Sequence, residues 1–222
     1  MIVAGRGAAS RPTVESGAGP AAGDDPGGTS IPGAEGPNAN ASAPALEDLV
    51  SLARAVLATC AARGLTIATA ESCTGGLVGH ALTEIPGSSA SFRGGVVAYA
   101  NDAKTALLGV DAALLARHGA VSAEVAEAMA DGARRRVGTD LAVAVTGVAG
   151  PDGGTAEKPV GLAYICATGP LGTRLLRCHW PYDRAGNKRA SAGVALAMLR
   201  DMAKETGDAG PPRSPESGPP PG

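Results

Sequence analysis

Residues 65–82 read LTIATAESCTGGLVGHAL, and the fold follows from this stretch. Its first part alternates apolar and polar residues as a strand does, and its last part repeats apolar residues at helical spacing. Ser72 therefore lies where a strand gives way to a helix. Backbone N–H groups at a helix start are unpaired and partly positive, so they suit a phosphate or a developing oxyanion. Gly75 and Gly76 would let a ligand approach closely. The stretch is also compatible with a simpler role in which Ser72 or Thr74 only caps the helix.

The segments around this unit alternate between helix and strand. Apolar periodicity and capping residues predict helices over about 44–64, 75–84, 103–108, 111–119, 123–137 and 186–204. Strands are predicted over 65–70, 95–99 and 141–145, with a late hairpin formed by 160–167 and 174–180. This order predicts a single α/β domain in which helices cover both faces of a mixed β-sheet.

The two ends of the chain differ in composition from its middle. Residues 1–45 are mainly Gly, Pro, Ala and Ser and contain neither an aromatic residue nor a leucine, and residues 207–222 are rich in Pro and Gly. Such segments bury too little apolar surface to offset the entropy of ordering them. We expect a disordered low-complexity extension over 1–45, a folded domain over 46–206 and a disordered tail over 207–222.

Composition excludes several classes of protein. The net charge is −2, no long basic block is present, and the chain has one Trp, one Phe and three Tyr, which argues against a nucleic-acid partner. The four cysteines show neither a CxxC pair nor metal-ligand spacing, so we expect reduced core thiols, no metal and no cofactor. There is no apolar run of about 18 residues and no apolar leader, which indicates a cytoplasmic protein without a membrane partner.

Two glycine-rich loops follow the carboxyl ends of predicted strands. They cover 72–76 and 146–155, and open α/β sheets place their ligand crevice at this edge. Neither loop matches GxxxxGK[ST] or a dinucleotide-binding GxGxxG in its proper context. We therefore expect a small-molecule site at this edge that belongs to neither of those nucleotide-binding classes.

A serine nucleophile at this site needs a base. His80, His118 and His179 fall in predicted helices or strands away from Ser72, so we expect structural roles for them. Lys104 follows the 95–99 strand and could replace histidine, as in serine–lysine catalysis. An isolated lysine is by default a solvated cation, and holding a free lysine neutral at pH 7 costs about 4–5 kcal/mol. Burial and a nearby cation would have to supply that shift in the pKa of Lys104.

Other residues near Ser72 leave alternatives open. Cys73 is a rival nucleophile that would act through a thioester, although no histidine is evidently placed to activate it. Glu71 is either a general base or a charge at the helix N-terminus. Tyr99 taken alone is compatible with a core tyrosine, and Thr146 with a turn former.

Several ordered motifs resemble the C-terminal domain of the competence/damage-inducible CinA family. The resemblance covers most of 46–206 and is carried by 70–76 (AESCTGG), 86–89 (PGSS), 94–101 (GGVVAYAN), Lys104, 119–122 (GAVS), 146–151 (TGVAGP) and 157–161 (EKPVG). Before the last helix the family usually has a glycine ahead of an Asp-Arg pair, where this chain has Tyr182. The larger N-terminal domain of full-length CinA proteins leaves no trace in the low-complexity extension, so we expect only the activity of the C-terminal domain.

The resemblance implies nicotinamide-nucleotide amidohydrolysis, a step of pyridine-nucleotide salvage. Nicotinamide mononucleotide and water would give nicotinic acid mononucleotide and ammonia. Ser72 is carried over as the nucleophile, with Tyr99 and Lys104 as its activating partners. The resemblance also implies ligand-binding roles for Thr146, Gly147, Gly150 and Arg189, and we expect backbone groups at Cys73, Thr74, Gly75 and Gly76 to hold the oxyanion.

Two other classes of function remain open at this point. One is a non-catalytic nucleotide-binding or regulatory module, and the other is an interaction protein. In each enzyme or binding case the expected partner is a small-molecule nucleotide. A homo-oligomer is compatible with a domain of this size, although no apolar stripe in the sequence marks an interface.

Overall fold

The computed structural model describes residues 42–206. Residues 1–41 of the extension predicted over 1–45, and the whole tail predicted over 207–222, lie outside the described residues. The elements, in chain order, are α1 (Leu46–Arg63), β1 (Ile67–Glu71), α2 (Leu77–Thr83), the 3₁₀ helix η1 (Ser88–Ala90), β2 (Phe92–Val97), α3 (Asn101–Leu108), α4 (Ala112–His118), α5 (Ala123–Val137), β3 (Leu141–Gly147), β4 (Leu162–Gly169), β5 (Gly172–His179) and α6 (Arg184–Thr206).

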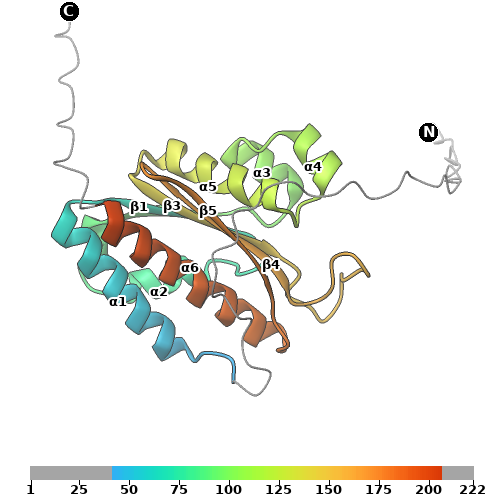
Figure 1. Cartoon of the computed structure of the whole chain (residues 1–222), viewed down its shortest axis with the longest axis horizontal. Coiled ribbons are helices and arrows are strands. Elements are labelled where there is room, and N and C mark those ends of the chain that lie inside the picture. The colour runs from blue at the N-terminus through green and yellow to red at the C-terminus, as the bar shows by residue number, and fades with distance from the viewer. Residues whose placement is uncertain (1–41, 207–222) are drawn as a thin grey trace, which may run out of the picture.

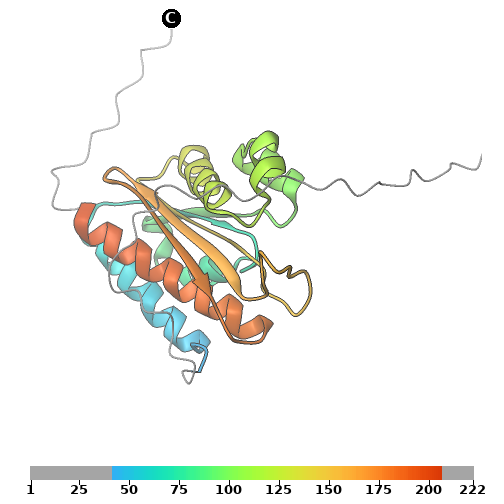
Figure 2. The same ribbon diagram turned by 45° about the vertical axis from the view of Figure 1, so that its right-hand side comes forward.

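The strands form one five-stranded mixed sheet in the order β2-β1-β3-β4-β5. The first three are parallel to one another, and β4 and β5 form an antiparallel hairpin beside them. Helices α1, α2 and α6 cover one face and α3, α4 and α5 the other, as Figure 1 and the turned view in Figure 2 show. The predicted α/β class with helices on both faces is confirmed.

The helix ends follow from local capping chemistry. Gly64 ends α1 in the left-handed conformation, with φ 65°, which glycine adopts without a Cβ penalty. Asp111 accepts a hydrogen bond from the N–H of Ala113 at the start of α4. Ser122 accepts one from Val125 at the start of α5. These three signals are visible in the sequence, and the observed ends agree with those predicted.

Strand β2 differs from its prediction. It runs over Phe92–Val97 instead of 95–99, because its parallel ladder with β1 begins at Phe92 and the pair Glu71–Val97 ends it. β2 is an edge strand in which half-buried and exposed residues alternate, so its first residues form no continuous apolar run. The sequence pattern therefore places the start of the strand too late. Tyr99 consequently lies in the connection to α3 rather than in a strand.

The core has two layers, one on each face of the sheet. In the central strand β3, the larger side chains of Leu141, Val143 and Val145 pack in the layer that contains α1 and α6. Ala142 and Ala144 face the layer of α5, where small side chains let the helix approach closely. Within residues 42–206, no helix combines the length and apolarity that crossing a membrane requires.

Candidate active site

The parallel strands bring three loops to one edge of the sheet. The register pairs Glu71 at the end of β1 with both Val97 and Val145, so β1, β2 and β3 reach this edge together. The N–H of Ser72 then donates to the Val145 carbonyl at 2.9 Å, and the N–H of Ala98 donates to the Glu71 carbonyl at 2.8 Å. The segments 72–76, 98–104 and 146–151 therefore start side by side.

The turn after β1 is held by Glu71. Its carboxylate accepts the N–H groups of Val78 at 3.0 Å and Gly79 at 2.9 Å, which belong to the first turn of α2. Glu71 thus has the helix-terminal role that was one of its two predicted alternatives. The residue at the N-cap of α2 is Gly76, which has no side-chain cap, so the alternative of Ser72 or Thr74 as a helix cap is not realised.

Lys104 is buried against Ser72. Its side chain is the largest fully buried one in the described residues and is 1% exposed. Its Nζ lies 3.1 Å from Ser72 Oγ and donates to the Ala98 carbonyl at 3.0 Å. The default expectation of a solvated, helix-terminal cation is therefore wrong, and the two groups that serine–lysine chemistry requires are in hydrogen-bonding contact.

Burial shifts the pKa values of two side chains at this site, Lys104 and Cys73. Desolvation lowers the pKa of Lys104, which favours the neutral amine that a general base requires. Desolvation also raises the pKa of Cys73 to about 12, so its thiol stays protonated near neutral pH. Because the thiolate is the nucleophilic form of cysteine, this environment disfavours Cys73 as the nucleophile.

The three histidines have partners elsewhere. His80 pairs with Glu84 on the exposed side of α2 at 3.9 Å. His118 Nδ1 lies 3.0 Å from a carboxylate oxygen of Glu124, and His179 Nε2 is hydrogen-bonded to the Val160 carbonyl at 3.0 Å. In the described part of the chain, the basic side chain in contact with Ser72 is Lys104.

A cavity of about 290 Å³ opens over this pair. Thr146 is fixed at its wall because its hydroxyl donates to the Ala120 carbonyl at 2.7 Å. A Cβ at Gly147 would lie 2.6 Å from the Leu162 carbonyl oxygen, so this position admits only glycine without a backbone shift. The sequence-predicted residues that line the cavity are Ser72, Cys73, Tyr99, Lys104, Thr146, Gly147 and Gly150.

Other predicted residues lie outside this cavity. Thr74 is fully buried, and Gly75 and Gly76 form the turn in left-handed conformations with φ 64° and 93°. Arg189 lines a second, larger cavity of about 870 Å³, where its Nε donates to the Pro44 carbonyl at 2.7 Å. Tyr99 is 59% exposed rather than in the core, and within residues 42–206 its hydroxyl is bonded to Arg184 and not to Ser72 or Lys104.

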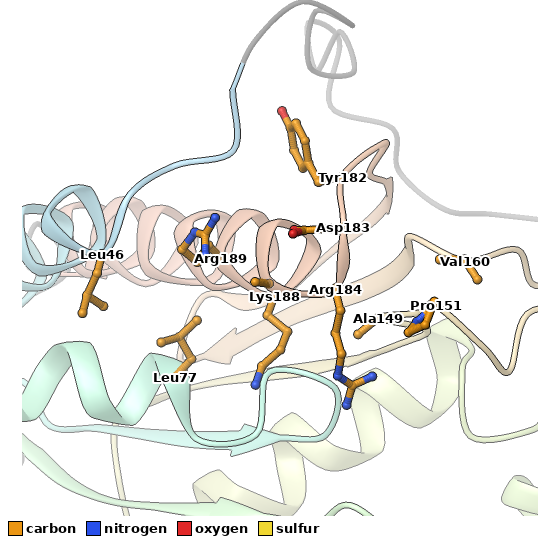
Figure 3. A pocket seen from close by; sticks show the side chains of 11 residues that line it. Leu46, Leu77, Ala149, Pro151, Val160, Tyr182, Asp183, Arg184, Lys188 and Arg189 are labelled. Carbon is orange, nitrogen blue, oxygen red and sulfur yellow. The ribbon is translucent and has the colours of Figure 1, made fainter.

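Sequence reasoning missed two cations at the start of α6. Arg184 lines both cavities, and Lys188 lines the larger one, with both side chains extending from α6 in the same direction (Figure 3). A Cβ built on Gly75 would lie 3.5 Å from Lys188 Nζ, so this amine faces the turn after Ser72. The i, i+4 spacing of Arg184 and Lys188 does predict a shared helix face. It does not predict which loop that face meets.

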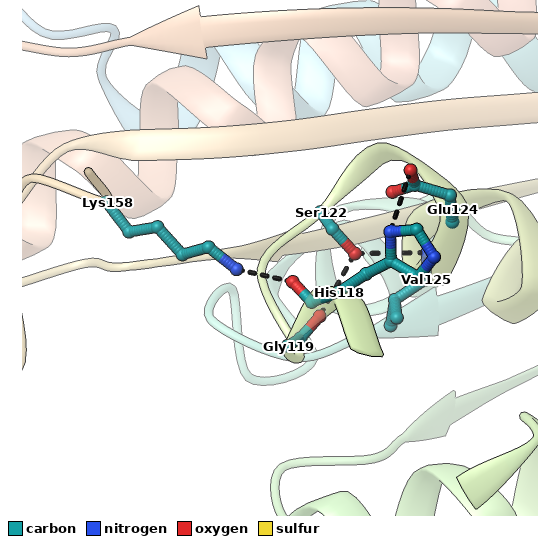
Figure 4. A network of polar contacts seen from close by, with 6 residues as sticks. All are labelled: His118, Gly119, Ser122, Glu124, Val125 and Lys158. Carbon is teal, nitrogen blue, oxygen red and sulfur yellow. Dashed lines mark hydrogen bonds and ion pairs between the residues drawn. The ribbon is translucent and has the colours of Figure 1, made fainter. Parts of the chain in front are cut away.

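Hydrogen bonds hold the wall of the Ser72 cavity that Ala120 and Val121 form. Lys158 Nζ donates to the His118 carbonyl at 2.5 Å, which ties the segment after β3 to the connection between α4 and α5 (Figure 4). Within that connection, Ser122 Oγ donates to the Gly119 carbonyl at 3.0 Å. Ala120 and Val121, which line the cavity, lie between these two contacts.

Known proteins share this sequence and architecture. The family model of the CinA C-terminal domain matches residues 49–203. A CinA-like protein of Gemmatimonas aurantiaca is 51% identical over 158 residues, which cover 71% of this chain and 37% of that protein. A CinA-like protein of Parasynechococcus marenigrum is 54% identical over 153 residues, covering 68% and 35%. The chain thus spans little more than a third of the length of these relatives.

Solved structures agree with the sequence comparisons. The competence/damage-inducible protein CihA from Agrobacterium tumefaciens has a TM-score of 0.68 and 44% identity, covering 70% of this chain and 95% of that one. A CinA superfamily protein from Klebsiella pneumoniae has a TM-score of 0.68 and 31% identity, covering 71% and 98%. With the family model matching well over half of its residues, this chain belongs to the CinA family, through the CinA C-terminal domain.

Proposed function

We propose that this protein is a nicotinamide-nucleotide amidohydrolase that converts nicotinamide mononucleotide and water to nicotinic acid mononucleotide and ammonia. The observation that carries the proposal is the contact of 3.1 Å between the buried Lys104 Nζ and Ser72 Oγ at the cavity wall. A buried amine beside a serine hydroxyl has little structural purpose, since burial of a lysine is costly, whereas serine–lysine hydrolysis requires it. The choice of a nicotinamide nucleotide as substrate rests on the family resemblance.

The proposed reaction proceeds through an acyl-enzyme. Neutral Lys104 accepts the proton of Ser72 Oγ as that oxygen attacks the carboxamide carbon and its C=O electron pair moves onto oxygen. The tetrahedral intermediate collapses, the C–N bond breaks, and the protonated Lys104 returns the proton to the departing nitrogen, which leaves as ammonia. Water, deprotonated by Lys104, then attacks the ester carbon, and the C–O bond to Ser72 breaks. Lys104 returns that proton to Ser72 Oγ, and the product acid leaves and loses its own proton to solvent as the carboxylate.

Backbone donors next to Ser72 support this chemistry. The N–H of Gly75 is engaged with the Ser72 carbonyl, whereas Cys73 lines the cavity next to Ser72. Backbone N–H groups in the turn that follows a nucleophile are suited to the oxyanion of the intermediate. Loss of one such donor typically lowers the rate by about 10²–10³.

The nucleotide phosphate requires a cation, and Lys188 is better placed for it than Arg189. Lys188 Nζ faces the Gly75 turn, within reach of a ligand whose other end is at Ser72. Arg189 is instead engaged with the Pro44 carbonyl. We therefore assign the phosphate to the space between Lys188 and the 72–76 turn.

The decisive measurement is ammonia release from nicotinamide mononucleotide by the purified chain. Ser72→Ala and Lys104→Met should each lower kcat by at least about 100-fold. The matched controls are Ser91→Ala, another buried serine, and Lys204→Met, an exposed lysine at the far end of α6, both with wild-type rates. Normal turnover by Ser72→Ala would refute the mechanism. Nucleotide binding without ammonia release from the wild type would instead support a non-catalytic binding module.

A further inference from the structure

Lys158 joins two walls of the Ser72 cavity that come from different parts of the chain. Residues 120–121, in the connection between α4 and α5, form one wall, and residues 152–153, in the segment after β3, form another. Lys158 lies further along this segment, and its Nζ donates to the carbonyl of His118, the last residue of α4 (Figure 4). The residues that line the cavity do not include Lys158 itself, so it can affect a bound ligand only through the two walls.

The contact between Lys158 and the end of α4 is closely fitted. The last carbonyls of a helix lack an N–H partner within it, and a lysine side chain can supply a donor to them. Gly119 follows His118 with φ 73°, and a Cβ at this position would lie 2.7 Å from Lys158 Nζ. Glycine therefore leaves open the space that the ammonium group occupies.

The connection that receives this bond is held together by its own contacts. Ser122 Oγ donates to the Gly119 carbonyl at 3.0 Å, which closes the connection on itself. His118 Nδ1 lies 3.0 Å from a carboxylate oxygen of Glu124, in the first turn of α5. A bond to the His118 carbonyl therefore also positions residues 120–121, which lie between these contacts.

The segment that carries Lys158 folds back on itself. Its residues 151–157 are exposed. The N–H of Thr155 donates to the Lys158 carbonyl at 2.9 Å, and the N–H of Lys158 donates to Thr155 Oγ1 at 3.0 Å. At the base of the segment, the N–H of Gly161 donates to the Val148 carbonyl at 2.8 Å. The two arms of the segment are thus joined, and Lys158 attaches this exposed loop to α4.

We propose that Lys158 is a positioning residue, whose bond to the His118 carbonyl holds the two walls of the Ser72 cavity at the separation at which the nicotinamide nucleotide binds. This inference rests on the proposed amidohydrolase function, in which the motif 157–161 has no role of its own. The contact of 3.1 Å between Ser72 Oγ and Lys104 Nζ depends instead on the paired ends of β1 and β2. Loss of the Lys158 contact therefore weakens substrate binding and leaves the reacting groups in place.

The test compares KM and kcat for ammonia release from nicotinamide mononucleotide. Lys158→Met keeps an unbranched apolar side chain but removes the ammonium, so KM should rise by about tenfold while kcat changes by less than about threefold. Lys158→Arg retains a donor for the carbonyl and should recover part of the loss. The control is Lys204→Met, which removes a lysine whose side chain is 57% exposed on α6 and should change neither constant. An unchanged KM in Lys158→Met, or a fall in kcat alone, overturns the inference, because a purely structural role lowers the amount of folded enzyme and not its affinity.

Amide hydrogen exchange, followed by mass spectrometry, separates this inference from the proposed function because it requires no substrate. Lys158→Met should speed exchange in peptides that cover 119–122 and 151–158 by about tenfold, whereas exchange in β1 and β3 should be unchanged. If the wild type releases no ammonia, the amidohydrolase proposal fails, while exchange in these two segments still tests whether Lys158 holds the walls together. Unchanged exchange in both segments overturns the inference, whatever reaction the protein catalyses.

Discussion

Replacing Glu71 with glutamine separates a structural role from a catalytic one. The Glu71 carboxylate is 2% exposed, and each of its oxygens accepts one backbone N–H, from Val78 at 3.0 Å and Gly79 at 2.9 Å. Glutamine has the same shape but only one acceptor oxygen, so its NH₂ would face one of these donors. The change loses a charge-assisted bond and leaves a buried N–H unpaired, which together cost about 3–5 kcal/mol in the free energy of unfolding.

Urea unfolding followed by the fluorescence of Trp180, the only tryptophan of the chain, measures this change. Glu71→Gln should lower the free energy of unfolding by about 3–5 kcal/mol, whereas ammonia release per folded molecule should fall by less than about tenfold, since Ser72 and Lys104 keep their contact. The control is Glu84→Gln, a half-exposed partner of His80, which should change stability by less than about 1 kcal/mol. A stable Glu71→Gln protein that has lost about 100-fold or more of its activity would show that Glu71 is a general base and refute this reasoning.

Three further substitutions test the site. Burial lowers the pKa of Lys104, so between that lowered value and the ordinary 10.5 the unfolded chain binds more protons than the folded one and the free energy of unfolding rises with pH. Lys104→Met should remove this rise from unfolding curves measured at a series of pH values. Ammonia release by the wild type should increase with pH to a midpoint below 10.5. Because burial raises the pKa of Cys73 to about 12, Cys73→Ala should retain activity and iodoacetamide should not inactivate the wild type at pH 7–8; inactivation that tracks labelling of Cys73 by mass spectrometry would contradict this. Gly147→Ala places a Cβ 2.6 Å from the Leu162 carbonyl oxygen and should cost about 1–3 kcal/mol in thermal unfolding, whereas Gly193→Ala in α6, with its nearest neighbour at 3.4 Å, should be neutral or stabilising.

Local chemistry explains which parts of the fold were predictable. Helix ends depend on residues within one turn, so the capping residues Gly64, Asp111 and Ser122 predict these ends from the sequence. The central strand β3 is buried on both faces, and its unbroken apolar run is equally visible. The limits of β2 depend instead on its register with β1, and that pairing is not encoded in the residues 92–94 themselves.

The candidate site likewise has features that the sequence predicts and contacts that it does not. Ser72 and Lys104 could be named from residue type and position, but their contact spans 32 positions in the sequence and depends on the parallel pairing of β1 with β2. The partner of Tyr99 is Arg184, which lies 85 positions away and comes from the last helix. No periodicity within either segment specifies such a contact, because it depends on where α6 begins relative to the loops.

The arrangement around Lys104 also explains why an acidic residue can directly precede the proposed nucleophile without favouring the charged form of the lysine. A carboxylate in contact with the amine would favour its charged form and raise its pKa, which would oppose its use as a base. Glu71 directly precedes Ser72, yet its oxygens are turned to the N–H groups of α2. Lys104 Nζ is held by the neutral Ala98 carbonyl, and no carboxylate in residues 42–206 forms an ion pair with it. The ladder bond from Ala98 N–H to the Glu71 carbonyl joins the two backbones. The same strand pair thus holds the Ala98 carbonyl that accepts from Lys104 and the residue Glu71, whose carboxylate is bound by α2.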